Sequence, residues 1–427
     1  MPVTLVDDAL TSAWREHWAR LLAMLVARYR RPDLAEDALA DAFAAAARTW
    51  PVDGVPDSPA AWLRTAAGRR VLDRLRAEAV AVQKEPLMIV EARSAAEATD
   101  GTPGVGDDGA HLPDDRLRLV FSCCHPALSV ESRAALTLRF VAGLPVPDIA
   151  RLFLVQDTTM AARLTRAKKR LVAAGIPFEV PPPERLDDRL DDVASVVYLT
   201  FTAGYAPGTG PDVLRVALAG EAIRLARLLD ELLPGRPVVR SLLALLVLQH
   251  SRRDARVAAD GSLVLLTDQD RSRWHGEEIA SGLALLASVP DGVTGLAHEY
   301  RLQASIAAAH AVAGRATDTD WGGIADLYAE LETATGSPMV RLARSVAVAE
   351  AEGPTAGLAL IDGFEGIDES LRTNHRLPAT RAELLARAGR PAEAVASFEE
   401  AIGRCGNAAE REHLTRRLAE VREDLLG

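Results

Sequence analysis

Apolar residues recur at three- and four-residue steps along almost the whole chain, which is the periodicity of amphipathic helices. Alternation of the strand type is scarce. The stretch "VAADGSLVLLTDQD" (257–270) is the one segment that we expect to turn as a hairpin, through Asp260 and Gly261. The pattern therefore predicts a mainly α-helical protein.

Breaks in the helical pattern define the expected domains. Residues 10–80 form a first helical block, with a loop containing Pro and Gly at 50–59. Residues 81–115 carry eight acidic and two basic residues without sustained periodicity, which predicts a flexible acidic linker. A second block covers 116–176, and the proline-rich run 175–188 joins it to a larger helical region, 187–427.

The C-terminal part of 187–427 shows an internal repeat. Three segments each combine a helix, a turn and a helix, with turn glycines Gly314, Gly353 and Gly389 spaced 39 and then 36 residues apart. Such periods suit tetratricopeptide-like helical pairs, which bury their apolar faces by stacking on neighbours. An ordinary helical bundle with unrelated glycine turns is the alternative.

Composition and charge narrow the class of protein. The 427 residues are 48% hydrophobic and have a formal net charge of −11, which argues against nucleic acid as a partner unless basic residues are concentrated locally. The sequence has no apolar run long enough to cross a membrane and no secretory signal pattern. Three cysteines, two of them adjacent, cannot form a disulfide framework, so we expect a cytoplasmic protein.

The second block reverses the charge balance. Residues 131–173 carry eight basic and three acidic residues. The pattern predicts a helix from 131, a turn, a short helix from about Pro147, and a basic helix with Asp157 or Thr158 as N-cap and Gly175 just past its end. This order is that of a helix-turn-helix.

The basic helix has two kinds of surface. Four apolar residues at three- and four-residue steps are expected to face the core: Met160, Leu164, Ala167 and Leu171. Polar residues near its N-terminal half are expected to reach base edges in a DNA major groove or phosphates: Thr158, Thr159, Arg163 and Arg166. Further along, phosphate contacts are expected from Lys168, Lys169 and Arg170. A solvated basic face is the alternative.

The first block contains an acidic helix followed by a basic one. The acidic helix, 33–50, clusters Asp33, Glu36, Asp37 and Asp41, whose carboxylates would repel DNA and so suit a basic protein partner or solvent. The basic helix, 59–76, carries Arg64, Arg69, Arg70, Arg74 and Arg76. Trp50 and Trp62 flank the intervening loop, and aromatic rings beside basic side chains suit unpaired DNA. Core packing of Trp62 is the alternative.

In this order the segments resemble the extracytoplasmic-function (group IV) sigma factors of bacterial RNA polymerase. "DLAEDALADAFAAAARTW" is similar to the region 2 helix that docks on the polymerase, which implies core polymerase contacts for the four acidic residues and Phe43. "AWLRTAAGRRVLDRLRAE" resembles the segment that opens and reads the −10 element, although Gly68-Arg69 stands where the family commonly has Arg-Asn. "LTLRFVAGLPVPDIARLFLVQDTTMAARLTRAKKRL" is similar to region 4, which reads the −35 element.

The remaining chain resembles the subgroup with a large C-terminal tetratricopeptide-like extension, through "FSCCHPALS", "EAIRLARLLDEL" and "LLTDQDRSRWHGEEIASGLALL". The resemblance implies a sigma factor that binds core RNA polymerase and promoter DNA, without covalent chemistry, cofactor or membrane contact. It also implies that the extension regulates or supports sigma activity, with a protein or small molecule as the regulator.

Other functions remain as alternatives. A one-component helix-turn-helix regulator with a helical sensor domain would leave 10–80 unexplained. An enzyme would need the polar cluster 268–274, near Arg252 and Arg253, to line a pocket, and an ion-pair network is the favoured interpretation of these residues. Cys123 and Cys124 lack a second ligand cluster at zinc-site spacing, so we expect them to pack rather than to bind metal.

Overall fold

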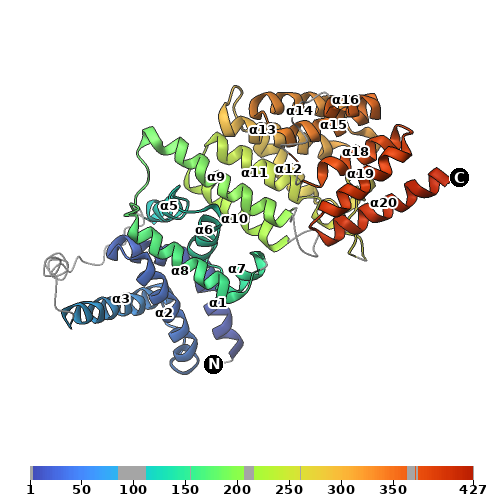
Figure 1. Ribbon diagram of the computed structural model, residues 1–427. Coiled ribbons are helices and arrows are strands. Elements are labelled where there is room, and N and C mark those ends of the chain that lie inside the picture. The colour runs from blue at the N-terminus through green and yellow to red at the C-terminus, as the bar shows by residue number, and fades with distance from the viewer. Residues whose placement is uncertain are drawn as a thin grey trace. The chain divides into compact units, whose positions relative to one another are not determined.

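A computed structural model describes residues 3–84, 112–153, 155–205, 216–259, 261–362, 371 and 374–426. Within these residues the chain is helical apart from turns and one isolated β-bridge, which confirms the mainly α-helical prediction. The chain divides into two compact units, Met1–Arg151 with Val155–Val193, and Leu152–Leu154 with Ala194–Gly427 (Figure 1). The segments 10–80 and 116–176, apart from residues 152–154, therefore belong to one unit.

The first unit is built around three long helices: α1 (Val3–Tyr29), α2 (Pro32–Asp53) and α3 (Pro59–Lys84). On α2, buried residues recur at helical spacing, including Leu39 and Phe43. Phe43 packs against Trp18 of α1 with ring centroids 5.9 Å apart, and Trp18 and Leu22 are at most 1% exposed. Gly54, with φ of 87°, ends α2 in a conformation that glycine adopts without strain, so the chain turns into the predicted loop before α3.

The rest of this unit carries the helix-turn-helix. It contains α5 (Leu112–Cys123), α6 (Val130–Leu136), the π-helical turn η1 (Thr137–Val141), α7 (Val146–Phe153) and α8 (Asp157–Ala173). The predicted linker 81–115 lies mostly outside the described residues, although α3 and α5 extend into its two ends. The predicted N-cap of the basic helix was wrong by one position: Gln156, in extended conformation, precedes α8, and Asp157 occupies the first helical turn.

The second unit begins within α9 (Pro183–Tyr205). It continues as a series of helices: α10 (Val216–Leu232), α11 (Pro237–His250), α12 (Gly276–Ala287), α13 (Gly295–Val312), α14 (Trp321–Thr335), α15 (Pro338–Glu352), α16 (Pro354–Asp362), α18 (Arg376–Arg387), α19 (Pro391–Arg404) and α20 (Ala408–Leu426). Helix α11 is buried on nearly every face, which marks it as a central helix of this unit.

Close helix packing in the second unit uses small residues. A Cβ atom added to Gly282 on α12 would lie 2.6 Å from Leu248 Cγ on α11, and one added to Gly357 on α16 would lie 2.5 Å from the Ser345 carbonyl oxygen. Positive φ angles at Gly353 and Gly389 form two of the three predicted turns. Consecutive helices pack on one another from α13 to α16 and from α18 to α20. The specific likeness to tetratricopeptide repeats stays a prediction.

The predicted hairpin at 257–270 is reduced to a single antiparallel bridge between Val257 and Leu263. Instead of a second strand, the chain forms two 3-10 turns, Leu266–Asp268 and Arg271–Arg273. Local side-chain bonds favour these turns, because the Asp270 carboxylate accepts a hydrogen bond from the Ser272 amide and Gln269 donates to the Val264 carbonyl oxygen.

Candidate functional site

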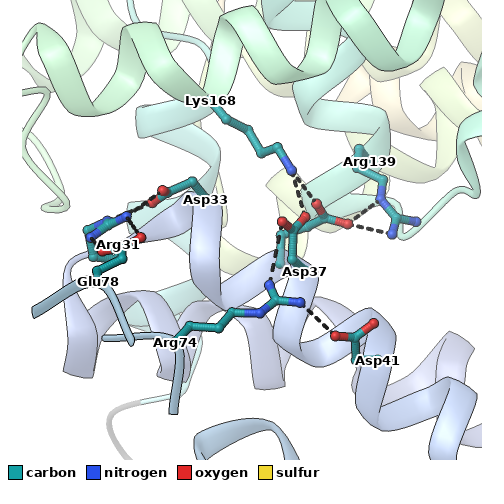
Figure 2. A network of polar contacts seen from close by, with 9 residues as sticks. Arg31, Asp33, Asp37, Asp41, Arg74, Glu78, Arg139 and Lys168 are labelled. Atoms are coloured by element: carbon teal, nitrogen blue, oxygen red, sulfur yellow. Dashed lines mark hydrogen bonds and ion pairs between the residues drawn. The ribbon is translucent and has the colours of Figure 1, made fainter. Parts of the chain in front are cut away.

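A network of ion pairs joins α2 to the helix-turn-helix within the first unit (Figure 2). Glu36 on α2 is 6% exposed. Its Oε1 accepts a hydrogen bond of 2.8 Å from Arg139 Nε, and its Oε2 lies 2.9 Å from Lys168 Nζ on α8. Lys168 Nζ also lies 2.8 Å from Asp37 Oδ1. The acidic and basic helices identified in the sequence therefore contact each other.

Arg139 is the buried basic partner of Glu36 in this network. It lies in the π-helical turn, and its guanidinium stacks 4.5 Å from the centre of the Trp18 ring. Trp18 Nε1 donates to the Arg139 carbonyl oxygen, and Trp14 Nε1 donates to the carbonyl oxygen of Gly143. A Cβ at Gly143 would lie 2.9 Å from the Trp18 ring, so this turn packs directly against α1.

The pairing keeps both buried groups charged. Burial raises the pKa of Glu36, but the nearby Arg139 and Lys168 lower it more, so the net pKa lies below the ordinary value. Burial lowers the pKa of Lys168, and Glu36 and Asp37 outweigh that effect, so its net pKa is raised. At neutral pH the network therefore consists of ions that compensate one another for their loss of hydration.

The other predicted polymerase-contacting acids also have basic partners inside the unit. Arg74 on α3 bridges Asp37 and Asp41 at 3.5 and 2.6 Å, and Arg31 pairs with Asp33 at 2.8 Å (Figure 2). Among these acids, Asp37 and Asp41 keep half-exposed side chains. Phe43, the fifth residue predicted to contact polymerase, is buried. Its ring packs against Trp14 and Trp18 in the core of the unit.

The residues predicted to contact the −10 element divide by exposure. Trp50 is 1% exposed and meets Trp62 edge to face, with ring centroids 5.7 Å apart. Trp62 is half-buried, so of the two rings it is the one that reaches the surface. Three of the predicted arginines are exposed on α3: Arg64, Arg69 and Arg76. The other two are partly occupied, since Arg70 donates to the Ala66 carbonyl oxygen and Arg74 holds the α2 aspartates.

On α8, the predicted apolar stripe is confirmed, because Met160, Leu164, Ala167 and Leu171 are all buried. Of the predicted −35 contacts, Arg163 is half-buried, whereas five are exposed: Thr158, Thr159, Arg166, Lys169 and Arg170. Lys168 differs from its neighbours, since only 13% of its side chain is exposed and it points into the Glu36 network.

Sequence reasoning missed three residues of this network: Trp14, Trp18 and Arg139. The available signal was a single charge inside the apolar run "LTLRFV", because a charged residue in a buried segment needs a partner.

Two clusters bear on metal binding and on the enzyme alternative. Cys123 and Cys124 are buried, and burial raises the pKa of both thiols. Ligand atoms of His375, Cys405 and Glu410 lie within 4.8 Å of one another, but His375 Nε2 and Glu410 Oε2 already pair at 2.8 Å. His375 and Glu410 therefore pair with each other, and Cys405 Sγ donates to the Asn407 carbonyl oxygen.

The ion pairs of the segment after α11 lie beside the polar cluster 268–274, so the predicted network of 268–274 itself is not seen among the described residues. Arg253 lies 2.8 Å from Glu278, and His275 lies 2.8 Å from Asp254. Arg271 donates to backbone carbonyl oxygens at 310 and 313. These contacts tie the segment to α12 and to the end of α13.

Comparison with known families supplies the decisive observation. Residues 13–80 match the family described as sigma-70 region 2, and residues 118–171 match sigma-70 region 4. The extracytoplasmic-function RNA polymerase sigma factor SigK of Mycobacterium ulcerans (strain Agy99) is 31% identical over 119 residues, 28% of this chain and 59% of SigK. The chain belongs to the extracytoplasmic-function sigma factors.

Other relatives extend this picture. SigK of Mycobacterium sp. (strain KMS) is 29% identical over 161 residues, which covers 37% of this sigma factor and 78% of SigK. An uncharacterized protein of Rhizobium meliloti (strain 1021) is 41% identical over 421 residues, 97% of this chain and 95% of the relative. The large extension is thus shared with a full-length relative. Residues 189–289 match a family of unknown function. No solved structure matches the chain.

Sigma factors are transcription initiation factors and not enzymes, in agreement with the sequence prediction. The family implies core RNA polymerase and promoter DNA as partners. No helix among the described residues is both long and apolar enough to span a membrane.

Proposed function

We propose that this sigma factor holds core RNA polymerase through the acidic surface of α2 and directs it to promoters in the cytoplasm. Exposed residues of α8 read the −35 duplex, and α3 with Trp62 stabilises the melted −10 strand. The single observation that carries the proposal is the ordered pair of region 2 and region 4 matches, within one unit whose α8 buries its apolar stripe and exposes its polar face.

The ion pairs of α2 support a further part of this proposal, which concerns the contact between the polymerase-binding and −35-binding segments in the free protein. Asp37 pairs with Lys168 and Arg74, and Glu36 pairs with Lys168 and Arg139. The negative charge of a carboxylate in such a pair is balanced by its partner. A basic polymerase surface therefore has to compete with Lys168 for that carboxylate. The free protein therefore holds its polymerase-binding and −35-binding segments together, and polymerase binding separates them.

Run-off transcription with bacterial core RNA polymerase on genomic promoter fragments tests the function. Discrete transcripts should depend on this protein, and reversing Asp37 and Asp41 to Lys should abolish them. Glu16 on α1 is an exposed acid away from this network, so Glu16→Lys controls for charge reversal. If the protein binds promoter DNA without polymerase and supports no transcript, the one-component regulator replaces this proposal.

The role of the extension is part of the same proposal. We expect the helices of 187–427 to regulate or support the sigma segment through a bound protein or small molecule. The observation that favours this role is the full-length relative, which shares nearly the whole extension together with the sigma segments.

A further inference from the structure

The second unit contains a cavity of about 560 Å³ that the sigma activity does not use. Its walls come from α9, α11, α13, α14 and α15 and from the segment after α11. A volume of this size accommodates a small molecule rather than an ion or a single water. The packing of the unit thus leaves a ligand-sized space among its helices.

Aromatic and apolar side chains form much of this cavity. Tyr198, Trp274 and Tyr328 line it, together with Ile306 and Met339. Trp274 is 8% exposed, and its buried Nε1 has no hydrogen-bond partner among the described residues. A buried donor without a partner is uncommon in a folded protein. The cavity lining therefore lacks a hydrogen-bond acceptor for the Trp274 N–H group.

Two opposite charges line the same cavity without pairing. Arg252 contacts the face of the Tyr205 ring at 5.6 Å, and no carboxylate of the described residues lies within ion-pair distance of it. Glu299 on α13 likewise has no basic partner among these residues. In contrast, Arg253, next to Arg252, pairs with Glu278. A half-buried charge facing a cavity is stabilised by an opposite charge brought by a ligand.

Residues near Arg252 add to the basic character of that side of the cavity. Burial, with Arg252 and Arg271 nearby, lowers the pKa of His310 to about 4, so this cavity residue is neutral at neutral pH. Arg271 lies 4.7 Å from the Trp274 ring centre and is held by backbone carbonyl oxygens. The cavity therefore combines one basic side, one carboxylate without a basic partner among the described residues, and a lining of aromatic and aliphatic side chains.

We propose that this cavity binds a small zwitterion with an apolar side chain, that is, a free amino acid or a short peptide. The ligand carboxylate pairs with Arg252, its ammonium group pairs with Glu299, and its side chain packs among Tyr198, Trp274 and Tyr328. Binding follows from the second unit alone; that the ligand controls transcription rests on the function proposed above.

Titration calorimetry and thermal unfolding of the full-length chain test this inference with matched probes. L-phenylalanine and L-leucyl-L-phenylalanine represent the two sources of the zwitterion, and the tighter of them identifies the class. N-acetyl-L-phenylalanine lacks the ammonium group and L-phenylalanine amide lacks the carboxylate. We expect each of these two probes to bind about tenfold more weakly than L-phenylalanine if a single amino acid is the ligand. The same modifications of the dipeptide serve if the dipeptide binds more tightly.

Substitutions of Arg252 and Glu299 test which charged group of the ligand each residue binds. Arg252→Met should remove the preference for a free carboxylate, and Glu299→Gln should remove the preference for a free ammonium group. Exposed Arg315→Met and Glu352→Gln are matched controls that should retain both preferences. The ligand-free melting temperature of each variant shows whether it is folded, and a variant that is unfolded is replaced by Arg252→Gln or Glu299→Ala, which removes the same charge and should remove the same preference.

The proposal is overturned if neither zwitterion binds, or if the blocked probes bind as tightly as the free ones. Failure of binding leaves run-off transcription without ligand unaffected, so it is distinguishable from failure of the sigma function. Conversely, binding by a chain that directs no transcription would retain the site and reject only its regulatory role.

Discussion

Lys168 and Glu36 lie 132 residues apart in the chain and form an ion pair of 2.9 Å between two largely buried side chains. Lys168 belongs to the helix expected to contact the −35 element, and Glu36 belongs to the helix expected to contact polymerase. The pair therefore links the two regions of the sigma segment directly. It makes both residues part of the stability of the free protein, whatever their role in the polymerase complex.

Removing this pair should destabilise the first unit. Lys168→Met leaves Glu36 buried with Arg139 as its remaining partner, so we expect a loss of about 1–3 kcal/mol in the free energy of unfolding. Lys169→Met changes an exposed neighbour and should alter stability by less than about 0.5 kcal/mol. Urea unfolding followed by circular dichroism measures both. Equal midpoints for the two variants would contradict the assigned role of Lys168.

The same network predicts how stability depends on pH. The pKa of folded Glu36 lies below its ordinary value, so the unfolded chain binds more protons at acidic pH. The stabilisation is present above the ordinary value of 4.5 and is lost as the pH falls through the lower folded pKa. Unfolding midpoints between pH 3 and pH 7 should show this acid decline, and Glu36→Gln should make it shallower. A decline of identical slope in both proteins would refute this assignment.

Two exposed residues of α8 should affect promoter binding in different ways. If Arg166 contacts a base, Arg166→Ala should cost about 1–3 kcal/mol and relax specificity at one −35 position. Lys169→Ala should weaken all promoters alike and reduce the salt slope by about one. Binding of the polymerase complex to a set of single-base promoter variants separates the two patterns. A uniform loss for Arg166→Ala would assign that residue to a phosphate instead.

Substitutions of Trp50 and Trp62 should affect different properties, namely the stability of the first unit and the rate of promoter opening. Trp50 is in the core, so Trp50→Ala should destabilise the first unit by about 3–5 kcal/mol. If a −10 base stacks on Trp62, Trp62→Ala should slow open-complex formation on duplex promoters, because one stacked base is worth about 1–3 kcal/mol. Trp62→Phe keeps an aromatic ring and should retain most of the rate. A premelted promoter should rescue Trp62→Ala, and persistence of the defect there would argue for a packing role alone.

The helical class, the order of the segments and the buried face of α8 were all predictable from the amino-acid sequence. Periodicity carries this information because three- and four-residue steps place side chains on one side of a helix, whatever that side meets. The stripe from Met160 to Leu171 and the loop after α2 follow from such local rules. The sequence also placed the candidate basic and acidic residues within the segments that match sigma-70 regions 2 and 4, and their DNA and polymerase contacts stay predictions.

The pairing of charges and the exposure of the aromatic rings depend instead on contacts between distant segments. Lys168 and Lys169 are neighbours in the sequence, yet one is buried in an ion pair and the other faces solvent. The difference depends on α2 lying against α8, a contact between segments 131 residues apart that no local pattern encodes. The same holds for Arg139, and for Arg252 and Glu299, which have no ion-pair partner among the described residues, because burial and pairing are properties of the assembled helices.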